Sequence, residues 1–149
     1  MTDMELVCDT LRQMGRNIAQ AVQSAADSLT GTQLNGKAEY IPEFQAACAA
    51  KNMLERPVGF VCRSTAGRVV RLLQTYDSTV YTQEPEELDA QWGFVWSTDP
   101  AHALPFLAIS TSPYMEGDCC EEDGRVWRSK QDNNVWAPSG YPDGWEVAE

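Results

Sequence analysis

The stretch Tyr114 to Val147, YMEGDCCEEDGRVWRSKQDNNVWAPSGYPDGWEV, contains the clearest fold signal in the chain. Asp123-Gly124 lies between a run that ends in Cys119-Cys120 and a run that starts at Arg125. Asp-Gly supplies the two positive-φ residues of a tight turn whose twist matches that of the flanking strands. Further turns and the closing run Trp145-Glu146-Val147 complete a plan of three short strands, which is too small to bury much surface by itself.

The same plan occurs earlier in the chain. Gly59 to Cys62 and Gly67 to Arg71 align with Gly117 to Cys120 and Gly124 to Arg128, so that Gly-Arg-Val-x-Arg recurs after a Cys. We therefore expect two tandem β-rich modules, residues 37–96 and 97–149, with hairpins at residues 57–71 and 117–128. Three weaker correspondences support the alignment: Tyr81 and Pro85 with Trp136 and Pro138, Trp92 to Val95 with Trp145 to Val147, and Ile41 to Phe44 with Leu104 to Phe106.

The second copy resembles a known family. Tyr114-x-x-Gly117-Asp118, Gly124-x-Val126-Trp127, Trp136-x-Pro138 and Trp145-x-Val147 are similar to the pattern of the small chitinase-type carbohydrate-binding module. Modules of this kind also recur, often in tandem, near the C-termini of bacteriophage tail-fibre and tail-tip proteins, and the chain resembles one of those. The resemblance covers the last third of the chain well and residues 40–95 weakly. It implies a virion protein that binds a host-surface glycan.

Composition excludes several classes of partner. The formal net charge is −11 in 149 residues, whereas binding to nucleic acid or to an anionic membrane surface needs clustered Lys and Arg. No apolar run approaches the roughly 20 residues of a membrane helix. The first five residues are acidic, unlike a signal peptide. We expect a soluble protein made in the cytoplasm, which reaches the virion by assembly.

The five cysteines have no metal-type spacing and no Cys-x-x-Cys motif. Cys119 and Cys120 are neighbours, so on a strand they point to opposite faces and cannot easily bridge each other. Cys62 aligns with Cys120, which indicates a repeated small apolar position. We expect buried free thiols, no metal and no cofactor.

Residues 1–36 are predicted to form an N-terminal helix and a linker. Thr2 and Glu5 form a capping-box pattern, Gly31 is placed to end the helix, and residues 31–37 read as a polar linker. Apolar or small residues then alternate in steps of four and three, the seam of a coiled coil. The helix either packs on its own domain or self-associates; self-association is favoured, as a homotrimer first and a dimer next. The seam residues are Val7, Leu11, Met14, Ile18, Ala21 and Ala25.

Residues 42–53 leave two alternatives open. The segment is rich in Ala and is compatible with a short helix that starts at Pro42 and places Phe44, Ala47, Cys48 and Lys51 on one face. It is equally compatible with an extended lead-in to the first module. The predicted fold class is therefore α+β: one amphipathic helix followed by two small β-rich modules.

Catalysis has little support in the sequence. His102 is the single histidine and no nucleophile, phosphate-loop or metal motif accompanies it. The carboxylates around Glu84 to Asp89 and Glu116 to Asp123 lack the spacing of a calcium loop and read as solvated hairpin rims. We expect a protein that binds rather than catalyses.

The aromatic residues divide into two groups. Trp92 and Trp145 close the repeats and are expected in the core. Trp127 replaces Val70, and Trp136 replaces Tyr81, so these large rings indicate either a bigger core or an exposed platform. Flat rings bind sugars by apolar contact while amides hold the hydroxyls. The candidate carbohydrate-binding residues are Trp127, Trp136, Tyr141, Gln131, Asp132, Asn133 and Asn134.

Three functional classes follow from these observations. The first is a fibre or tail-tip protein that binds a cell-surface polysaccharide. The second is a structural virion subunit, such as a head-decoration, head-fibre or baseplate protein, whose modules contact other virion proteins. The third is a binding module detached from a larger hydrolase, which would be monomeric.

Overall fold

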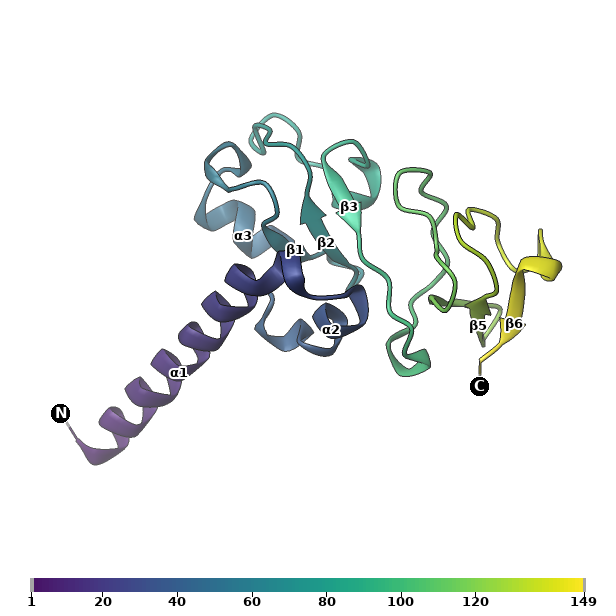
Figure 1. Cartoon of the computed structure of the whole chain (residues 1–149). Coiled ribbons are helices and arrows are strands. Elements are labelled where there is room, and N and C mark those ends of the chain that lie inside the picture. Colours follow the sequence, from purple (N-terminus) through teal and green to yellow (C-terminus); the bar gives the residue numbers. More distant parts are fainter. Residues whose placement is uncertain (1, 149) are drawn as a thin grey trace.

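The computed structural model describes residues 2–148 and has the predicted α+β architecture (Figure 1). A long helix, α1 (Asp3–Ala25), is followed by two three-stranded antiparallel sheets. The first, sheet A, has the order β1-β2-β3, and the second, sheet B, has the order β4-β5-β6. Short 3-10 turns connect these elements, at Ala26–Ser28, Ala38–Tyr40, Met53–Glu55, Pro85–Glu87, Pro100–His102 and Pro142–Gly144.

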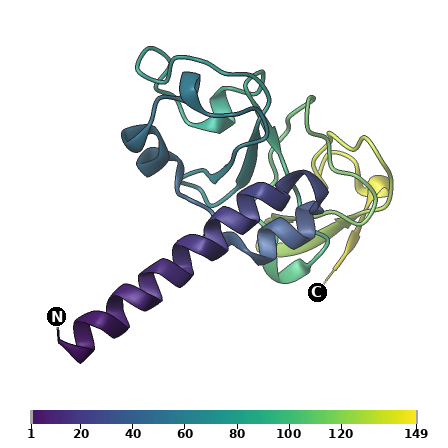
Figure 2. The same ribbon diagram turned by 60° about the vertical axis from the view of Figure 1, so that its left-hand side comes forward.

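Helix α1 begins at the predicted capping box. The Thr2 hydroxyl accepts from the Glu5 N–H at 3.1 Å, and the Glu5 carboxylate accepts from the Thr2 N–H at 2.7 Å. Figure 2 shows the N-terminal half of the helix projecting away from the rest of the molecule. Its last turns dock on sheet A, where the Gln23 amide donates to the carbonyl of Val61 at 2.7 Å and accepts from its N–H at 3.1 Å. One side-chain amide thus pairs with the edge of β1 as a neighbouring strand would.

The predicted linker after α1 is wrong. Residues 31–36 form a second helix, α2 (Gly31–Gly36), and Gly31 begins this helix instead of ending α1. The reason is a second capping box: the Thr30 hydroxyl accepts from the Gln33 N–H, and the Gln33 side chain accepts from the Thr30 N–H. Gly31 is required there because a Cβ at this position would lie 2.1 Å from the carbonyl oxygen of Trp96.

The open question at residues 42–53 is decided in favour of a helix, α3 (Phe44–Ala50). The Glu43 carboxylate caps it by accepting from the Ala46 N–H at 3.0 Å, so the helix starts after Pro42. Hydrogen bonds from the backbone N–H groups of Gln45 and Ala46 lower the pKa of Glu43. Phe44 and Ala47 are buried, Cys48 is half-buried and Lys51 is exposed.

Sheet A contains β1 (Val61–Arg63), β2 (Val69–Leu72) and β3 (Trp92–Phe94). Sheet B contains β4 (Cys119–Glu122), β5 (Arg125–Ser129) and β6 (Trp145–Val147). Both predicted hairpins are confirmed. Asp123 and Gly124 have φ values of 54° and 76°, the two positive values that the Asp-Gly turn requires.

The two sheets match at the level of single hydrogen bonds. Cys62 pairs with Val70 as Cys120 pairs with Trp127. Gly59 and Gly117 both have a φ of 95° and donate to Leu72 and Ser129, which occupy the same place in β2 and β5. The lead-in segments also correspond: the carbonyls of Pro42 and Leu104 accept from Arg63 and Glu121, and Phe44 and Phe106 each meet the closing Trp edge-to-face.

Sheet A is covered on both of its faces. One face carries a core that includes Phe44, Cys62, Val70 and Trp92, with Trp92 fully buried as predicted. The other face packs on the end of α1 and on α2, through a second cluster of buried side chains. Residues 22–36 therefore belong to the same folded unit as the first module. The second cluster contains Val22, Ala26, Leu34, Ile41, Val61 and Val69.

Sheet B has a smaller core, which is joined to the first module by a run of aromatic rings. Its buried members are Tyr114, Cys120 and Trp145, so Trp145 is a core residue as predicted. The ring of Trp96 stacks on that of Phe94 at 5.6 Å between centroids, and on Tyr114 at 4.2 Å. Phe106 follows on Tyr114 at 5.4 Å. The rings form one continuous path from sheet A to sheet B.

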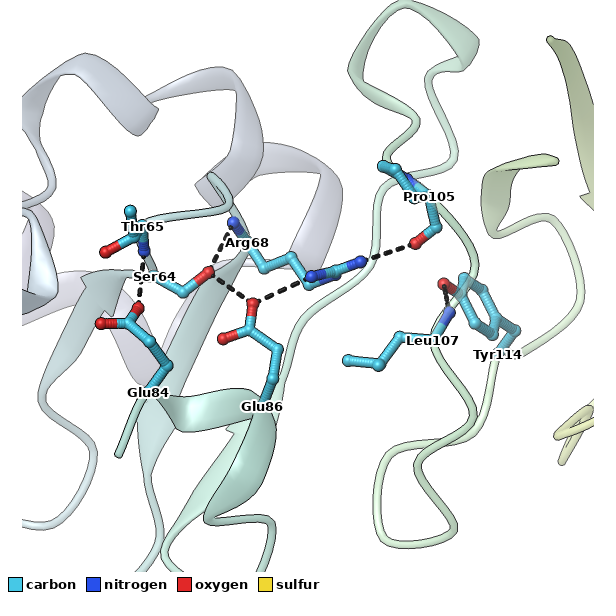
Figure 3. Close-up of polar contacts among 8 residues, drawn as sticks. All are labelled: Ser64, Thr65, Arg68, Glu84, Glu86, Pro105, Leu107 and Tyr114. Atoms are coloured by element: carbon cyan, nitrogen blue, oxygen red, sulfur yellow. Dashed lines mark hydrogen bonds and ion pairs between the residues drawn. The ribbon is translucent and has the colours of Figure 1, made fainter. Parts of the chain in front are cut away.

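A buried arginine also joins the modules (Figure 3). One terminal nitrogen of Arg68 donates to the Glu86 carboxylate and the other donates to the carbonyl of Pro105, each at 2.9 Å. The same Glu86 oxygen accepts from the Ser64 hydroxyl at 2.8 Å. On the far side, the Tyr114 hydroxyl accepts from the Leu107 N–H at 3.3 Å.

All five cysteines are free, and Cys62, Cys119 and Cys120 are buried. Burial raises the pKa of Cys120 to about 12, so this thiol stays protonated and packs as a small hydrophobe. No helix within residues 2–148 has the length and apolar content needed to span a membrane.

Candidate binding site on the second module

Trp136 and Tyr141 form an exposed aromatic corner at the far end of the second module. Their ring centroids are 5.5 Å apart and the ring planes meet at 73°. Trp136 is 51% exposed, so its ring is a platform and not part of the core. The two rings open onto a hollow of about 420 Å³, which is also lined by Gln131 and Gly140.

The backbone of Trp136 is held firmly even though its ring is exposed. Its carbonyl accepts from the indole N–H of the buried Trp145 at 2.8 Å. Its N–H donates to the side-chain oxygen of Asn134 at 3.3 Å. The core thus fixes the base of the platform, and binding there needs little reordering of the chain.

Tyr141 is oriented by two neighbours. Its hydroxyl donates to the Gln131 side-chain oxygen at 3.2 Å, which leaves the Gln131 amide hydrogens available to a ligand. A Cβ on Gly144 would lie 2.7 Å from two atoms of the Tyr141 ring. Gly144 is therefore needed for the present position of this ring.

The other predicted sugar-binding residues do not line the hollow. Asn134 is fully buried, and its amide donates to the Ser129 hydroxyl and the Gly144 carbonyl, each at 3.1 Å. It holds the loop instead of lining the hollow. Asp132 and Asn133 are exposed on the same turn but do not line the hollow either; the Asp132 carboxylate accepts from the Glu116 N–H at 3.0 Å.

Trp127 also lies away from the corner. Its ring is half-buried against the core of sheet B, and its indole N–H donates to the carbonyl of Glu122 at 3.3 Å. The Arg125 guanidinium lies 5.8 Å from the centre of its ring. Trp127 therefore fits the bigger-core alternative, whereas Trp136 fits the platform alternative.

The corresponding loop of the first module carries no such corner. Pro85 and Pro138 both precede the closing Trp by seven residues, and the Gln91–Leu88 backbone bond matches the Gly144–Tyr141 bond. On this register Trp136 corresponds to Gln83 and Tyr141 to the buried Leu88, so the expected match of Trp136 with Tyr81 is wrong. The equal Pro-to-Trp spacing is the sequence signal that would have found this register.

Among residues 2–148, no charged side chain lines the hollow at the corner. A neutral polyhydroxylated ligand fits this lining, because a sugar ring places apolar C–H groups against the Trp136 face and hydroxyls beside the Gln131 amide. The lining residue that sequence reasoning missed is Gly140. Its N–H and the N–H of Tyr141 both donate to the Ala137 carbonyl, and the turn that results borders the hollow.

A larger hollow, of about 640 Å³, lies between α1 and the first module. Its two arginines are already engaged: Arg63 donates to the Ile41 carbonyl, and Arg56 donates to the Ala47 carbonyl while lying 4.5 Å above the Phe60 ring. Phe60 is itself buried. We favour the smaller hollow as the candidate binding site. Of the two hollows, only this one is lined by a half-exposed indole ring, that of Trp136, whose backbone is hydrogen-bonded to the core.

The apolar stripe of α1 is exposed along its whole length. Leu11 is 62% exposed and Ile18 is 40% exposed. Ala21 and Ala25 remain exposed even where Val22 and Ala26, on the neighbouring flank, are buried against sheet A. The docking of the helix therefore leaves the predicted seam uncovered. Its other members, Val7 and Met14, are exposed as well, as are Met4 and Leu6.

His102 and the acidic and thiol side chains form no metal-ligand cluster within residues 2–148. His102 is exposed, and its Nε2 lies 3.9 Å from a carboxylate oxygen of Asp99. Within residues 2–148, no three His, Cys, Asp or Glu side chains gather in a way that could hold a metal ion.

Comparisons with family models, curated proteins and solved structures gave no match to this chain.

Proposed function

We propose that this chain is a non-enzymatic virion protein of a bacteriophage fibre or tail tip, which binds a host-surface glycan through its second module. The observation that carries the glycan part is the aromatic corner: a half-exposed Trp136 set against Tyr141 over an uncharged hollow. The virion part rests on the resemblance of the repeats to modules found in tail proteins.

The proposed contact is a stacked sugar. One hexose ring lies on the Trp136 indole, the edge of Tyr141 limits its position, and the Gln131 amide donates to a hydroxyl. Because the hollow is shallow and a single ring is covered on one face, each site is weak. Useful affinity then needs several copies on one particle, where avidity adds on the order of 10²–10⁴.

Helix α1 is the proposed means of collecting copies. It carries its exposed stripe away from the module that binds sugar, at the opposite end of the molecule (Figure 1). Self-association through α1 therefore leaves the aromatic corner free. Other virion proteins are the alternative partners of this stripe.

The test is Trp136→Ala, assayed on a glycan array and by pull-down on purified bacterial wall polysaccharide and insoluble chitin. The matched control is Tyr81→Ala, which removes an equally exposed aromatic ring (52%) from the first module. We expect Trp136→Ala to abolish binding, Tyr81→Ala to keep it, and both to stay folded. Equal binding by the two variants would reject the site.

A second variant sharpens the test. Gly144→Ala places a methyl group 2.7 Å from two atoms of the Tyr141 ring and 3.1 Å from the Asn134 amide nitrogen, so it displaces the Tyr141 ring while the Trp136 side chain itself is unchanged. We expect binding to weaken but not to vanish, since the Trp136 platform remains.

The alternative function is a structural virion subunit, a head-decoration, head-fibre or baseplate protein, that uses its modules for protein contacts. It is favoured by exposed apolar side chains on the first module, among them Val58 at 65%, Val80 at 65% and Leu73 at 45%. In that case no array glycan binds, and Val80→Asp, not Trp136→Ala, prevents incorporation into particles.

A further inference from the structure

The exposed stripe of α1 has a definite order of side-chain sizes. Large residues occupy the N-terminal part, at Met4, Val7, Leu11, Met14 and Ile18, and alanine follows at positions 21 and 25. The stripe is unpartnered over the whole length of the described helix, and its flank at Val22 and Ala26 is buried in the chain's own first module. Any pairing of two copies must satisfy both facts.

We propose that two copies of the chain pair through α1 in antiparallel orientation, about a two-fold axis that passes between residues 12 and 13. In this register the stripe residues from Met4 to Ala21 pair with one another, and Ala25 lies beyond the start of the second helix. Met4 faces Ala21 of the second copy, Val7 faces Ile18, and Leu11 faces Met14. A large side chain thus meets a small one at the ends of the contact, and two side chains of similar size meet at its centre, so that the layers fill evenly.

A parallel pair lacks this complementarity. It stacks Met4 on Met4 at one end and Ala21 on Ala21 at the other, so the two helices lie farthest apart at the tips and closest beside the modules. It also brings together two bodies in chains that each carry a net charge of −11, which repel each other. The antiparallel pair places the two bodies at opposite ends of the contact.

A parallel trimer meets a further obstacle. Each helix of a trimer contacts its neighbours on both flanks of the stripe. One flank of α1 is already occupied, because Val22 is only 6% exposed and packs with Leu34 and Val61 of its own chain. In the antiparallel pair the second helix begins about level with Val22, so that little of it lies beside the covered flank.

This inference deepens the proposed function, because it defines how the sugar sites are arranged: two corners at the two ends of an elongated dimer. It predicts two-point attachment to a long polysaccharide. The trimer favoured by the heptad pattern would instead cluster its sites at one end. The two arrangements are separable by experiments that need no sugar.

The decisive experiment is a charge exchange across the two-fold axis. Leu11→Asp and Met14→Lys each leave an unpaired charge in the homodimer, so we expect each alone to weaken pairing on the order of 100-fold. Mixed, they place Asp opposite Lys in the antiparallel register, and we expect a heterodimer by sedimentation velocity and native mass spectrometry. A parallel contact gives no rescue, because position 11 then faces position 11.

The control is Gln13→Asp, which adds the same charge away from the stripe and should leave the dimer intact. A spin label at Glu5→Cys, in a Cys8→Ser/Cys48→Ser background, measures orientation directly: antiparallel pairing separates the two labels by about 22 Å along the axis. A parent mass of one or three chains, a mixture that stays monomeric, or labels side by side would each overturn the proposal. Trp136→Ala should keep the dimer, and Leu11→Asp should keep monovalent sugar binding, so failure of the pairing and failure of the sugar site are distinguishable.

Discussion

Sheet A and sheet B share a hairpin plan, yet they are stabilised in different ways. Sheet A has helices or buried side chains on both faces, and its edges are capped by Gln23 on β1 and by the Ser112 hydroxyl, which accepts from the Phe94 N–H. The core of sheet B has three buried members, Tyr114, Cys120 and Trp145, and half-buried rings complete it, including Trp96 from the first module. The two sheets therefore share a strand register, but sheet B depends on the first module for part of its core whereas sheet A has a larger core of its own.

The difference has a functional consequence. A module with a large core of its own can carry a helix that extends into solvent. The smaller module places the ring of Trp136 outside the core, while the Trp136 carbonyl accepts from the indole N–H of the buried Trp145. The module with the smaller core is the one that exposes the candidate site.

The largest expected effect comes from removing the closing tryptophans. Trp92→Ala and Trp145→Ala should each cost about 3–5 kcal/mol, because both rings are buried in their cores. Trp92→Ala should unfold both modules, whereas Trp145→Ala should unfold the second and leave sheet A protected. Amide hydrogen exchange reads out each sheet separately. Trp136→Ala, at an exposed ring, is the control, and its free energy of unfolding should change by no more than about 0.5 kcal/mol. If the amides of sheet B stay protected in Trp92→Ala, sheet B does not depend on the first module.

The next largest effect concerns the buried arginine between the modules. Arg68→Met removes the cation from Glu86 and the donor from the Pro105 carbonyl, and the side chains of the ion pair are only 10% and 17% exposed. Leaving Glu86 uncompensated should cost about 3 kcal/mol, measured by chemical denaturation. The double variant Arg68→Met/Glu86→Gln should recover most of this loss. If it is no more stable than the single variant, the ion pair does not stabilise the junction.

Much of this architecture could be read from sequence because local signals agree. Two signals set the local backbone conformation: the Asp123-Gly124 turn and the capping box at Thr2. A third is the position of Trp92 and Trp145 at the end of each repeat, which marks them as core residues. The Asp123-Gly124 turn joins two strands whose register matches that of the first hairpin.

The errors have different causes: the capping box at Thr30 is a local signal that was overlooked, whereas other errors depend on contacts made only in the folded chain. Gly31 reads as a helix end, but its lack of a side chain serves the close approach of Trp96, 65 residues later. Asn134 reads as a sugar-binding amide, but buried Gly144 and Ser129 use its hydrogen bonds. Of the seven predicted sugar-binding residues, the structure brings Gln131, Trp136 and Tyr141 together around the hollow.

A smaller effect tests the junction through Gly31. Gly31→Ala should destabilise the protein by about 1–3 kcal/mol, because the new methyl group meets the Trp96 carbonyl and forces α2 away from the connection between the sheets. Gly36→Ala is the matched control at the other end of α2, where a Cβ meets nothing within 4 Å. Thermal unfolding of the two variants measures the contrast. Equal melting temperatures would mean that the α2 contact is not tight.

The smallest effect is a pH dependence of stability that comes from Asp118 in the second module. Asp118 occupies the place that Phe60 has in sheet A, and burial, with Asp132 nearby, raises its pKa above the usual 3.8, although the Met115 N–H opposes the shift. The folded state therefore favours the protonated carboxyl: its stabilising contribution is fully present below pH 3.8 and is lost as the pH rises through the raised pKa. Asp118→Asn keeps an acceptor for the Met115 N–H without the charge, so at pH 7 it should be slightly more stable than the parent, and this advantage should disappear in acid. Denaturation curves of parent, Asp118→Asn and the exposed control Asp143→Asn at pH 7 and pH 3 measure it; an advantage that persists unchanged at pH 3 would show that the carboxylate charge is not its cause.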